Sequence, residues 1–385
     1  LETYLCDVLR SPNGQRLFPL RNLLTPALRA DWPSSIGPIN LGEHDGPHKS
    51  SVTEWWYYNT HLKAADGREY SAFVCFFRIG LNKEHTSYAH ALNWAITDVS
   101  AGRYISDGLI DRVAPKAIKK TLEKGIFTDP RLRRAMEEVL NKDSVPLPDR
   151  MFQRDPAVST KELNMDMEDA TLTKNRAGGY VVHAHSPDGK HSLDLVFAPR
   201  KAPVHHGLNG VVKGHDGDDM FYYFIPRCSV QGTLKVDGEN IAVSGDGWYD
   251  HEFGGVYQEN GAALDHSYAW NWAAMQLDNG WEITAAVLLH PRAMPGMSSR
   301  SRFIEMSTRL MVTAGSDALL LPTFRLVDGF CCGRRLLASA DRYCISRVQT
   351  VRQIFFFSMC RPFLGSVRRR TYLAAPVAVA LLGGQ

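Results

Sequence analysis

The sequence predicts an all-β protein, built mainly from antiparallel strands that form barrels or sandwiches. Short segments rich in β-branched and aromatic residues recur along the chain, separated by turns rich in Gly, Asp and Asn. The 8 Trp, 14 Tyr and 17 Phe gather in clusters at 55–58, 221–224 and 270–272, as in aromatic-lined barrels. A chain of 385 residues with 44% hydrophobic residues can bury the core of two large β domains, or of two to three smaller ones.

The first half of the chain contains an irregular start, a group of strands and a helical insertion. Residues 1–50 are rich in Pro, Gly and Asn and have little periodicity. Apolar spacing predicts a helical insertion at about 111–141, carried by Ala114–Leu122 and Pro130–Leu140, before a polar loop at 142–160. The expected strands here are Glu54–Leu62, Glu69–Ile79 and Ser87–Thr97, and the first two are joined by a turn at 65–67.

The β pattern returns after residue 160. We expect Asp237-Gly238 to form a hairpin turn, because both positions of that turn need positive φ, and we expect 199–219 to be a long loop. The expected strands are Leu163–Leu172, Gly179–Ser186, His191–Ala198, Phe221–Pro226, Ser229–Val236, Asn240–Ser244, Ser267–Leu277 and Gly280–Leu289.

This pattern predicts four parts. They are an irregular lead-in at 1–50, a first β domain with the insertion at 51–225, a second and less complete β domain at 226–310, and an atypical basic tail containing Cys at 311–385. Residues 330–385 hold nine Arg and one Asp but no Lys or Glu, and we expect no regular strand alternation there. One interpretation is a native basic tail. The one we favour is an altered gene end, such as read-through into an intron or a shifted frame, so we draw no function from it.

Several classes of function are excluded by composition and spacing. A net charge of +3, with no dense basic block in the first 300 residues, argues against a nucleic-acid partner. The seven Cys are irregularly spaced with no CxxC pair, which argues against a disulfide framework and a structural zinc site. No phosphate loop, nucleotide fingerprint or GxSxG elbow occurs, and the 14 His show no metal-ligand spacing, so we expect neither cofactor nor metal.

Location and partners follow from the same observations. The chain begins at Leu1 without a recognisable signal peptide, and no apolar run reaches about 18 residues, so we expect a cytoplasmic protein without a transmembrane segment. A peripheral membrane contact stays open. The expected partner is a hydrophobic small-molecule substrate, and the sequence leaves the oligomeric state open.

The strongest candidate for chemistry is Gly247–Gly255, with the sequence GWYDHEFGG. On a strand, Asp250 and Glu252 would face one way and His251 the other. Burial among neighbouring aromatic rings would raise the pKa of a carboxyl group, which could then donate a proton at neutral pH. The alternative is a structural corner, in which the carboxylates bind backbone amides at the rim of a barrel.

Two aromatic groups are candidates for substrate binding. Trp55 to Tyr58 would cover both faces of one strand, either as core packing and a contact between domains or as the lining of a ligand cavity. Trp270, Trp272 and Gln276 would share one strand face, which gives the apolar wall and the few polar groups of a small-molecule site. Aromatic faces can also stabilise a cationic intermediate.

Five stretches resemble the carotenoid 1,2-hydratase (hydroxyneurosporene synthase) family and its AttH-like relatives, which include fungal secondary-metabolite cyclases. The resemblance covers roughly residues 45–290, and its motifs are EWWYYNTHL, SYAHALNWAITD (which contains Asn93), FYYFIPRCSVQGTL, GDGWYDHEFG and AWNWAAMQLDNGWEI. It implies two lipocalin-like β-barrels side by side and cofactor-free chemistry on hydrophobic isoprenoid or polyketide-like substrates.

The resemblance also implies roles for individual residues. Asp250 matches the acidic group, and Trp270 and Trp272 match the aromatic wall that faces it. Glu54, Trp55 and Tyr223 match further motif positions, and Tyr57 and Asn93 lie within motifs. We therefore expect Asp250, His251 and Glu252 to be catalytic. We expect substrate to contact Trp55, Tyr57, Asn93, Tyr223, Trp270, Trp272 and Gln276.

Three functions are consistent with these observations. The first is an acid-catalysing enzyme that acts on a terpenoid or polyketide natural product. It would hydrate this molecule, open an epoxide in it, or cyclise it. In this enzyme Asp250 donates the proton, and His251 or Glu252 tunes the acidity of Asp250 or positions water. The second is a cyclase of the Diels–Alder type that works by the shape of its pocket. The third is a lipocalin-like carrier without chemistry.

Overall fold

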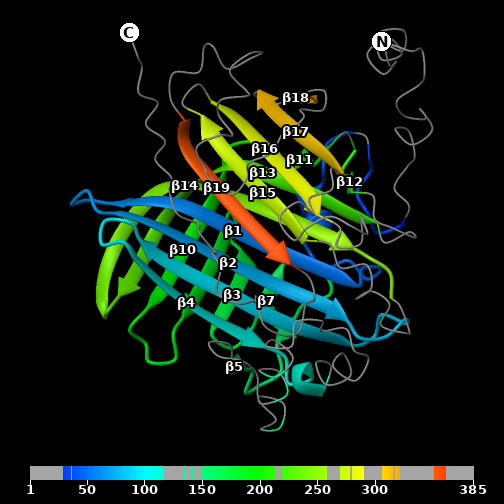
Figure 1. The fold of residues 1–385 in the computed structure, drawn as a ribbon, viewed down its shortest axis with the longest axis horizontal. Coiled ribbons are helices and arrows are strands. Elements are labelled where there is room, and N and C mark those ends of the chain that lie inside the picture. Colours follow the sequence, from blue (N-terminus) through cyan, green and yellow to red (C-terminus); the bar gives the residue numbers. More distant parts are fainter. Residues whose placement is uncertain are drawn as a thin grey trace.

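A computed structural model describes residues 29–35, 37–116, 134, 137, 141, 150–207, 209–212, 219–257, 269–277, 280–289, 306–314, 317–320 and 351–360 (Figure 1). Within them the fold is mostly β and mainly antiparallel, which confirms the predicted class. The pair β4 and β5 is the one parallel pairing among the described strands.

The larger sheet has 14 strands and curls on itself (Figure 1). Its order is β5-β4-β3-β2-β1-β14-β13-β10-β9-β8-β7-β6, and β11 and β12 also pair with β13. The strands are β1 (Thr53–Ala64), β2 (Glu69–Gly80), β3 (Tyr88–Asp98), β4 (Arg103–Ile110), β5 (Arg150–Met151), β6 (Ala157–Val158), β7 (Asn164–Asp166), β8 (Ala170–Lys174), β9 (Tyr180–His185), β10 (Ser192–Pro199), β11 (Val204–His205), β12 (Val211–Val212), β13 (Met220–Val236) and β14 (Glu239–Gly254).

The second sheet has five strands in the order β18-β17-β16-β15-β19. These strands are β15 (Ala269–Leu277), β16 (Trp281–Leu289), β17 (Met306–Ala314), β18 (Asp317–Leu320) and β19 (Val351–Cys360). Within 330–385, where we expected no regular strand alternation, β19 forms a strand that pairs with β15. Three consecutive Phe at 355–357 interrupt the apolar–polar alternation by which a half-buried strand is recognised.

Helix is scarce among the described residues. The short helix α2 (Leu41–His44) lies in the lead-in, and the Asn40 side chain accepts the Gly42 N–H at its start. Within the expected helical insertion, residues 114–116, 134 and 137 are helical, and most of the rest lies outside the described residues. No helix of the described part is long and apolar enough to span a membrane.

Strands β13 and β14 form one long hairpin. Its turn is Asp237-Gly238, with φ of 53° and 88°, as expected for the tight turn of a hairpin. Two separate strands were expected along β13, and this was wrong, since Met220–Val236 is continuous with a register shift between Ile225 and Cys228. Pro226 has no N–H to pair, and the bulge accommodates it. The expected domain boundary at 225/226 falls inside this strand.

The expected strand Leu163–Leu172 is in fact a small hairpin. Strands β7 and β8 are joined by a turn in which Met167 and Ala170 bond each other through their backbones. Glu168 in this turn has a φ of 63°, a conformation that a strand cannot contain.

The pleat of the large sheet separates two cores. One face, here called the barrel core, buries Trp56, Tyr58 and Tyr249 together with most of the apolar side chains. The opposite face, here called the seam, buries Tyr57, Phe73, Cys75, Phe77, Phe224 and Trp248 together with Trp272 of β15. Strands β15 and β16 cross over β1, β13 and β14 in Figure 1, so the seam is the contact between the two sheets.

Candidate functional site

Asp250 lies in the seam at the middle of the large sheet. Its strand neighbours are Tyr57 of β1 and Phe224 of β13, and the residue is 6% exposed. The Tyr222 hydroxyl donates to Asp250 Oδ1 at 2.7 Å, and the Trp248 indole N–H donates to the same oxygen, also at 2.7 Å. Both hydrogen bonds that the described residues make to this carboxyl group therefore fall on Oδ1.

The environment of Asp250 favours its neutral form. Burial raises the pKa of this carboxyl group from 3.8 to about 7, against the opposing effect of the hydrogen bonds from Tyr222 and Trp248. Around neutral pH both the acid and its conjugate base are therefore populated. A group with this property can give up a proton and take it back, which is what general acid catalysis requires.

Aromatic rings enclose this carboxyl group. Trp272 reaches across from β15 and meets Trp248 and Tyr57 edge-on, with ring centroids 5.7 and 6.2 Å apart. Trp248 also stacks on Phe224 at 4.9 Å. Burial raises the pKa of Tyr57 well above 10, with Asp250 adding to the effect, so Tyr57 stays a neutral phenol.

The expected residues Glu252 and Trp55 lie one step along the same face. They are direct partners across β1 and β14, and both are partly buried. Asn93 shares the row of Asp250, but β1 and β2 lie between their strands. At about 4.8 Å between strands, the Asn93 backbone is thus roughly 14 Å from that of Asp250.

Gln276 and Trp270 are the two remaining residues that we expected to contact substrate. Gln276 lies in the seam, where its Nε2 donates to Pro226 O at 2.8 Å and to Gly247 O at 3.1 Å. Its amide therefore binds the backbone of the large sheet beside the β13 bulge. Trp270 belongs to β15, and its side chain lies outside the described part.

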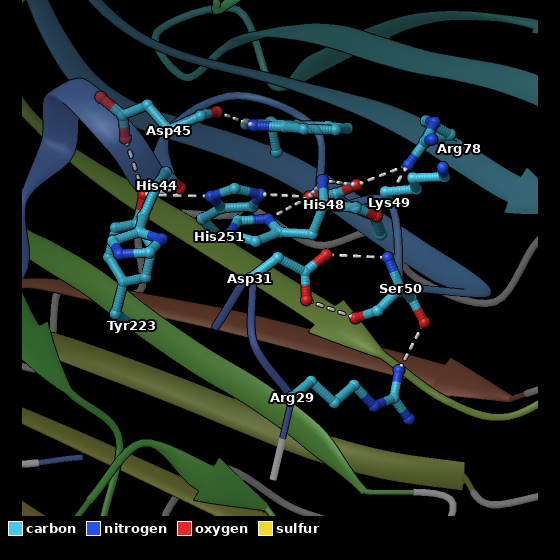
Figure 2. Close-up of polar contacts among 12 residues, drawn as sticks. Arg29, Asp31, His44, Asp45, His48, Lys49, Ser50, Arg78, Tyr223 and His251 are labelled. Atoms are coloured by element: carbon cyan, nitrogen blue, oxygen red, sulfur yellow. Dashed lines mark hydrogen bonds and ion pairs between the residues drawn. The ribbon is translucent and has the colours of Figure 1, made fainter. Parts of the chain in front are cut away.

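His251 and Tyr223 lie on the other face, in the barrel core, away from Asp250. Figure 2 shows His251 between Tyr223 and His48. Its Nδ1 is 3.0 Å from the Tyr223 hydroxyl, which in turn donates to Asp45 at 2.7 Å. Burial lowers the pKa of His251, although a hydrogen bond to Glu54 favours the charged form.

Glu54 is the centre of this second network, and its side chain is fully buried. His48 Nδ1 lies 2.8 Å and His251 Nε2 3.1 Å from its Oε1, and Arg78 donates to its Oε2 at 3.0 Å. Burial alone would raise the pKa of Glu54, but hydrogen bonds from His251 and His48 outweigh it and lower the value to about 2. Glu54 is thus a buried carboxylate held ionised by its donors.

Three of these side chains could in principle ligate a metal, a cluster that the spacing of the His residues did not predict. The ligand atoms of His48, Glu54 and His251 lie within 4.8 Å of one another. A cation there would displace hydrogen bonds that Glu54 already accepts and would lie beside the Arg78 guanidinium. We therefore interpret the cluster as a hydrogen-bonded ionic network that joins β1, β2 and β14.

One narrow space lies among the buried side chains of the large sheet. It is lined by Tyr58, Ala72, Phe73, Val74, Val182, Leu193, Leu195 and Phe197. It has no room for a water molecule. A lipophilic ligand would therefore not fit at this place in the barrel core.

Sequence reasoning missed Tyr222 and the role of Trp248 as a donor. The motif FYYF alternates in facing, so it places Tyr222 and Phe224 on one face. Counting back from the Asp237-Gly238 turn would have placed Ile225 opposite Asp250, because the count ignores the bulge at Pro226. The bulge moves the register by one residue, which brings Phe224 opposite Asp250 and Tyr222 to its face.

Comparison with known proteins agrees with this fold. Residues 148–320 match the family model described as AttH-like. An AttH crystal structure from Nitrosomonas europaea is 17% identical, with a TM-score of 0.52 over 77% of this chain and 74% of the other. None of the curated protein sequences matches the chain.

Two further solved structures are similar at lower TM-scores. Kievitone hydratase from Nectria haematococca is 12% identical, with a TM-score of 0.47 over 77% of this chain and 71% of that one. CghA with Sch210972 is 12% identical, with a TM-score of 0.28 over 69% of this chain and 59% of that one. The fold assignment rests on the family match and the Nitrosomonas structure: the chain carries an AttH-like segment at residues 148–320 and has the AttH-type β fold.

Proposed function

We propose that this protein is a cofactor-free acid catalyst that acts on a lipophilic small molecule bound at the seam. The observation that carries the proposal is the state of Asp250, a carboxyl group buried among aromatic rings with a pKa raised to about 7. Hydration of a double bond, opening of an epoxide and cation-driven cyclisation all begin with such a proton donor.

The contacts of Asp250 give the proton a fixed place. Tyr222 and Trp248 both donate to Oδ1, so in the neutral acid the proton belongs on Oδ2, where it avoids a clash with two donors. In this proposal Oδ2 is the atom that protonates substrate. After transfer, the same two donors stabilise the carboxylate until it recovers a proton.

The surrounding rings suit a substrate that becomes positively charged. The faces of Trp248, Trp272 and Tyr57 can stabilise a carbocation by cation–π attraction, which is strongest where water is excluded. Glu252, on the same strand face as Asp250, is the group we propose to position or deprotonate an attacking water. His251 faces the barrel core, so we assign it to the support of β14 and not to contact with substrate.

The test is turnover by Asp250→Asn against candidate terpenoid and polyketide substrates. Asn keeps the shape and the acceptor oxygen but has no acidic proton, so we expect product formation to fall by at least 100-fold. We expect the rate of the wild type to fall above about pH 7, as Asp250 loses its proton. Full activity of Asp250→Asn would reject the acid role.

A cyclase that works by shape is a second candidate, favoured by the aromatic rings that crowd the seam. In that case Trp248→Leu or Trp272→Leu would impair turnover more than Asp250→Asn does. The comparison of these variants separates the two functions.

A further inference from the structure

Among the described residues of the seam, Trp272 has an indole N–H that makes no hydrogen bond of good geometry. The residue is 5% exposed, and its closest contact to an acceptor, the Tyr222 hydroxyl, does not reach the geometry of a hydrogen bond. The neighbouring Trp248, met edge-on at 5.7 Å, uses its own N–H on Asp250. A buried donor without an acceptor is costly and uncommon, so this N–H can hydrogen-bond to a ligand that brings an acceptor atom.

The contacts of Trp272 place this donor next to the acid. The Trp272 N–H lies near enough to the Tyr222 hydroxyl to favour ionisation of that phenol slightly, although burial raises its pKa well above 10 overall. The same hydroxyl donates to Asp250 at 2.7 Å. An acceptor atom that paired with Trp272 would therefore lie beside the hydrogen-bonded pair of Tyr222 and Asp250.

Two more unpaired polar atoms lie on the same face of the second sheet. They are Gln276 Oε1, on the strand of Trp272, and Thr284 Oγ1 of β16. Thr284 is the direct partner of Ala274, so its side chain shares the face that Trp272 and Gln276 turn toward the large sheet. Unpaired atoms also occur elsewhere, as at Trp32 and Trp94, but three of them share the face that the second sheet turns toward the large sheet.

We infer that the ligand of the seam is an oxygenated lipophile, and that an epoxide, carbonyl or ether oxygen of this molecule accepts a hydrogen bond from the indole N–H of Trp272 beside Asp250. This inference rests on the proposed function and narrows its substrate class. A pure hydrocarbon would leave the donor unpaired and would gain only from the apolar walls. An oxygenated substrate satisfies Trp272 and brings its basic atom to the acid.

The chemistry that follows is proton transfer to that oxygen. Oδ2 of Asp250 gives its proton to the epoxide or carbonyl oxygen, and the pair of electrons of the breaking C–O or C=O bond moves onto this oxygen. The carbon becomes electrophilic, and water or a double bond of the same molecule supplies the new bond. A proton released from that nucleophile returns to Asp250, which restores the acid.

Matched probes test the inference without knowledge of the true substrate. Limonene and limonene 1,2-epoxide have the same carbon skeleton and differ by one acceptor oxygen. Binding of each is measured by titration, together with the ¹H–¹⁵N signal of the Trp272 indole, which Trp272→Phe assigns by its loss. We expect wild type to bind the epoxide roughly tenfold more tightly, a factor that corresponds to 1.4 kcal/mol, and the indole proton to shift downfield with the epoxide alone.

Trp272→Phe keeps an aromatic ring and removes the N–H, so it should bind both probes equally well. Trp94→Phe is the matched control, because Trp94 is also a buried indole with an unpaired N–H but lies in the barrel core. It should keep the preference for the epoxide. Equal affinity of wild type for the two probes, an unmoved Trp272 signal, or a preference that survives in Trp272→Phe would overturn the inference.

Asp250→Asn separates this inference from the proposed function. If Asp250→Asn keeps both the preference for the epoxide and the turnover of wild type, the seam binds an oxygenated ligand without acid catalysis by Asp250. If Asp250→Asn loses turnover but wild type binds both probes equally well, the acid role stands and the assignment of the substrate oxygen fails.

Discussion

Asp250 and His251 are adjacent in the chain but serve opposite faces of β14. Asp250 enters the seam, where Tyr222 and Trp248 bind it. His251 enters the barrel core, where it binds Glu54 at 3.1 Å. The two side chains therefore do not form one site: the first has the properties of an acid, and the second anchors the strand that carries it.

The raised pKa of Asp250 should make the protein less stable as pH rises from about 4 to about 7. Over this range the unfolded chain has released the proton while the folded chain keeps it, so folding is favoured at low pH and loses this contribution as pH increases. Asp250→Asn has no group that titrates at this position, so its stability does not fall in this way. By urea unfolding, we expect the variant to gain about 4 kcal/mol on wild type between pH 4 and pH 8, from 1.36 kcal/mol per pKa unit.

The matched control for that experiment is Asp246→Asn. Asp246 lies four residues earlier on β14, and its side chain is 28% exposed. Its replacement removes a partly exposed ion pair with Arg227 at 3.8 Å, so we expect the free energy of unfolding to change by less than about 1 kcal/mol. An equal gain in both variants, or none in Asp250→Asn, would contradict the buried-acid assignment.

Tyr222→Phe should raise the pKa of Asp250 further. The Tyr222 hydroxyl stabilises the carboxylate, and its removal favours the neutral acid by on the order of one pKa unit. The Trp248 indole ¹H–¹⁵N signal reports the titration, because its N–H binds Asp250 directly. The midpoint of this signal against pH should move upward in the variant.

Tyr223→Phe is the control for this shift, since Tyr223 is the next residue but faces the barrel core. Its variant should leave the midpoint of the Trp248 signal unchanged. A midpoint that moves in Tyr223→Phe and stays in Tyr222→Phe would show that the register of β13 differs from the one described.

Glu54→Gln should destabilise the protein strongly at neutral pH. The change leaves the buried Arg78 guanidinium without its carboxylate, which costs about 3–5 kcal/mol. The pKa of Glu54 is lowered from 4.5 to about 2, so its contribution is present above pH 4.5 and is lost as pH falls toward 2. The difference between variant and wild type in urea unfolding should narrow over that window.

Glu43→Gln provides the comparison, because the Glu43 side chain is 68% exposed and meets only His44 at 3.8 Å. We expect a change within about 0.5 kcal/mol. If Glu54→Gln behaved like Glu43→Gln, the network would not hold β1 to β14.

Glu282→Gln should loosen the second sheet from the first. The Glu282 carboxylate is buried and binds Lys201 at 2.5 Å and the Nε of Arg227 at 2.7 Å. Hydrogen exchange in β15 should quicken, and the stability should fall by about 3 kcal/mol, at the low end of the cost of breaking a buried pair. Glu239→Gln, which removes an exposed partner of Arg68, should change stability by less than about 1 kcal/mol.

Local rules predicted much of the fold and the facing of the candidate acid. The Asp237-Gly238 turn and the alternation along Gly247–Gly255 depend on neighbouring residues alone, so the sequence specified the hairpin and separated Asp250 from His251. The Glu54 network could not be read in this way. Its members His48 and His251 are far apart in the chain and meet because β1 and β14 pair.

The register around the site was also beyond a local pattern. Pro226 signals an irregularity in β13, but its position does not say whether the chain ends the strand or inserts a bulge. The bulge decides which of Tyr222 and Tyr223 shares a face with Asp250. The three Phe at 355–357 hid β19 for a related reason, since a continuous apolar run carries no period.

The central claim is that Asp250 exchanges its proton near pH 7, and its own titration tests this claim most directly. Protein labelled with ¹³C at the Asp carboxyl carbon, with the Asp250 signal assigned by its loss in Asp250→Asn, would be followed by NMR from pH 4 to pH 9. We predict a midpoint near pH 7 for this signal. A midpoint near 4, the ordinary value for Asp, would contradict the account.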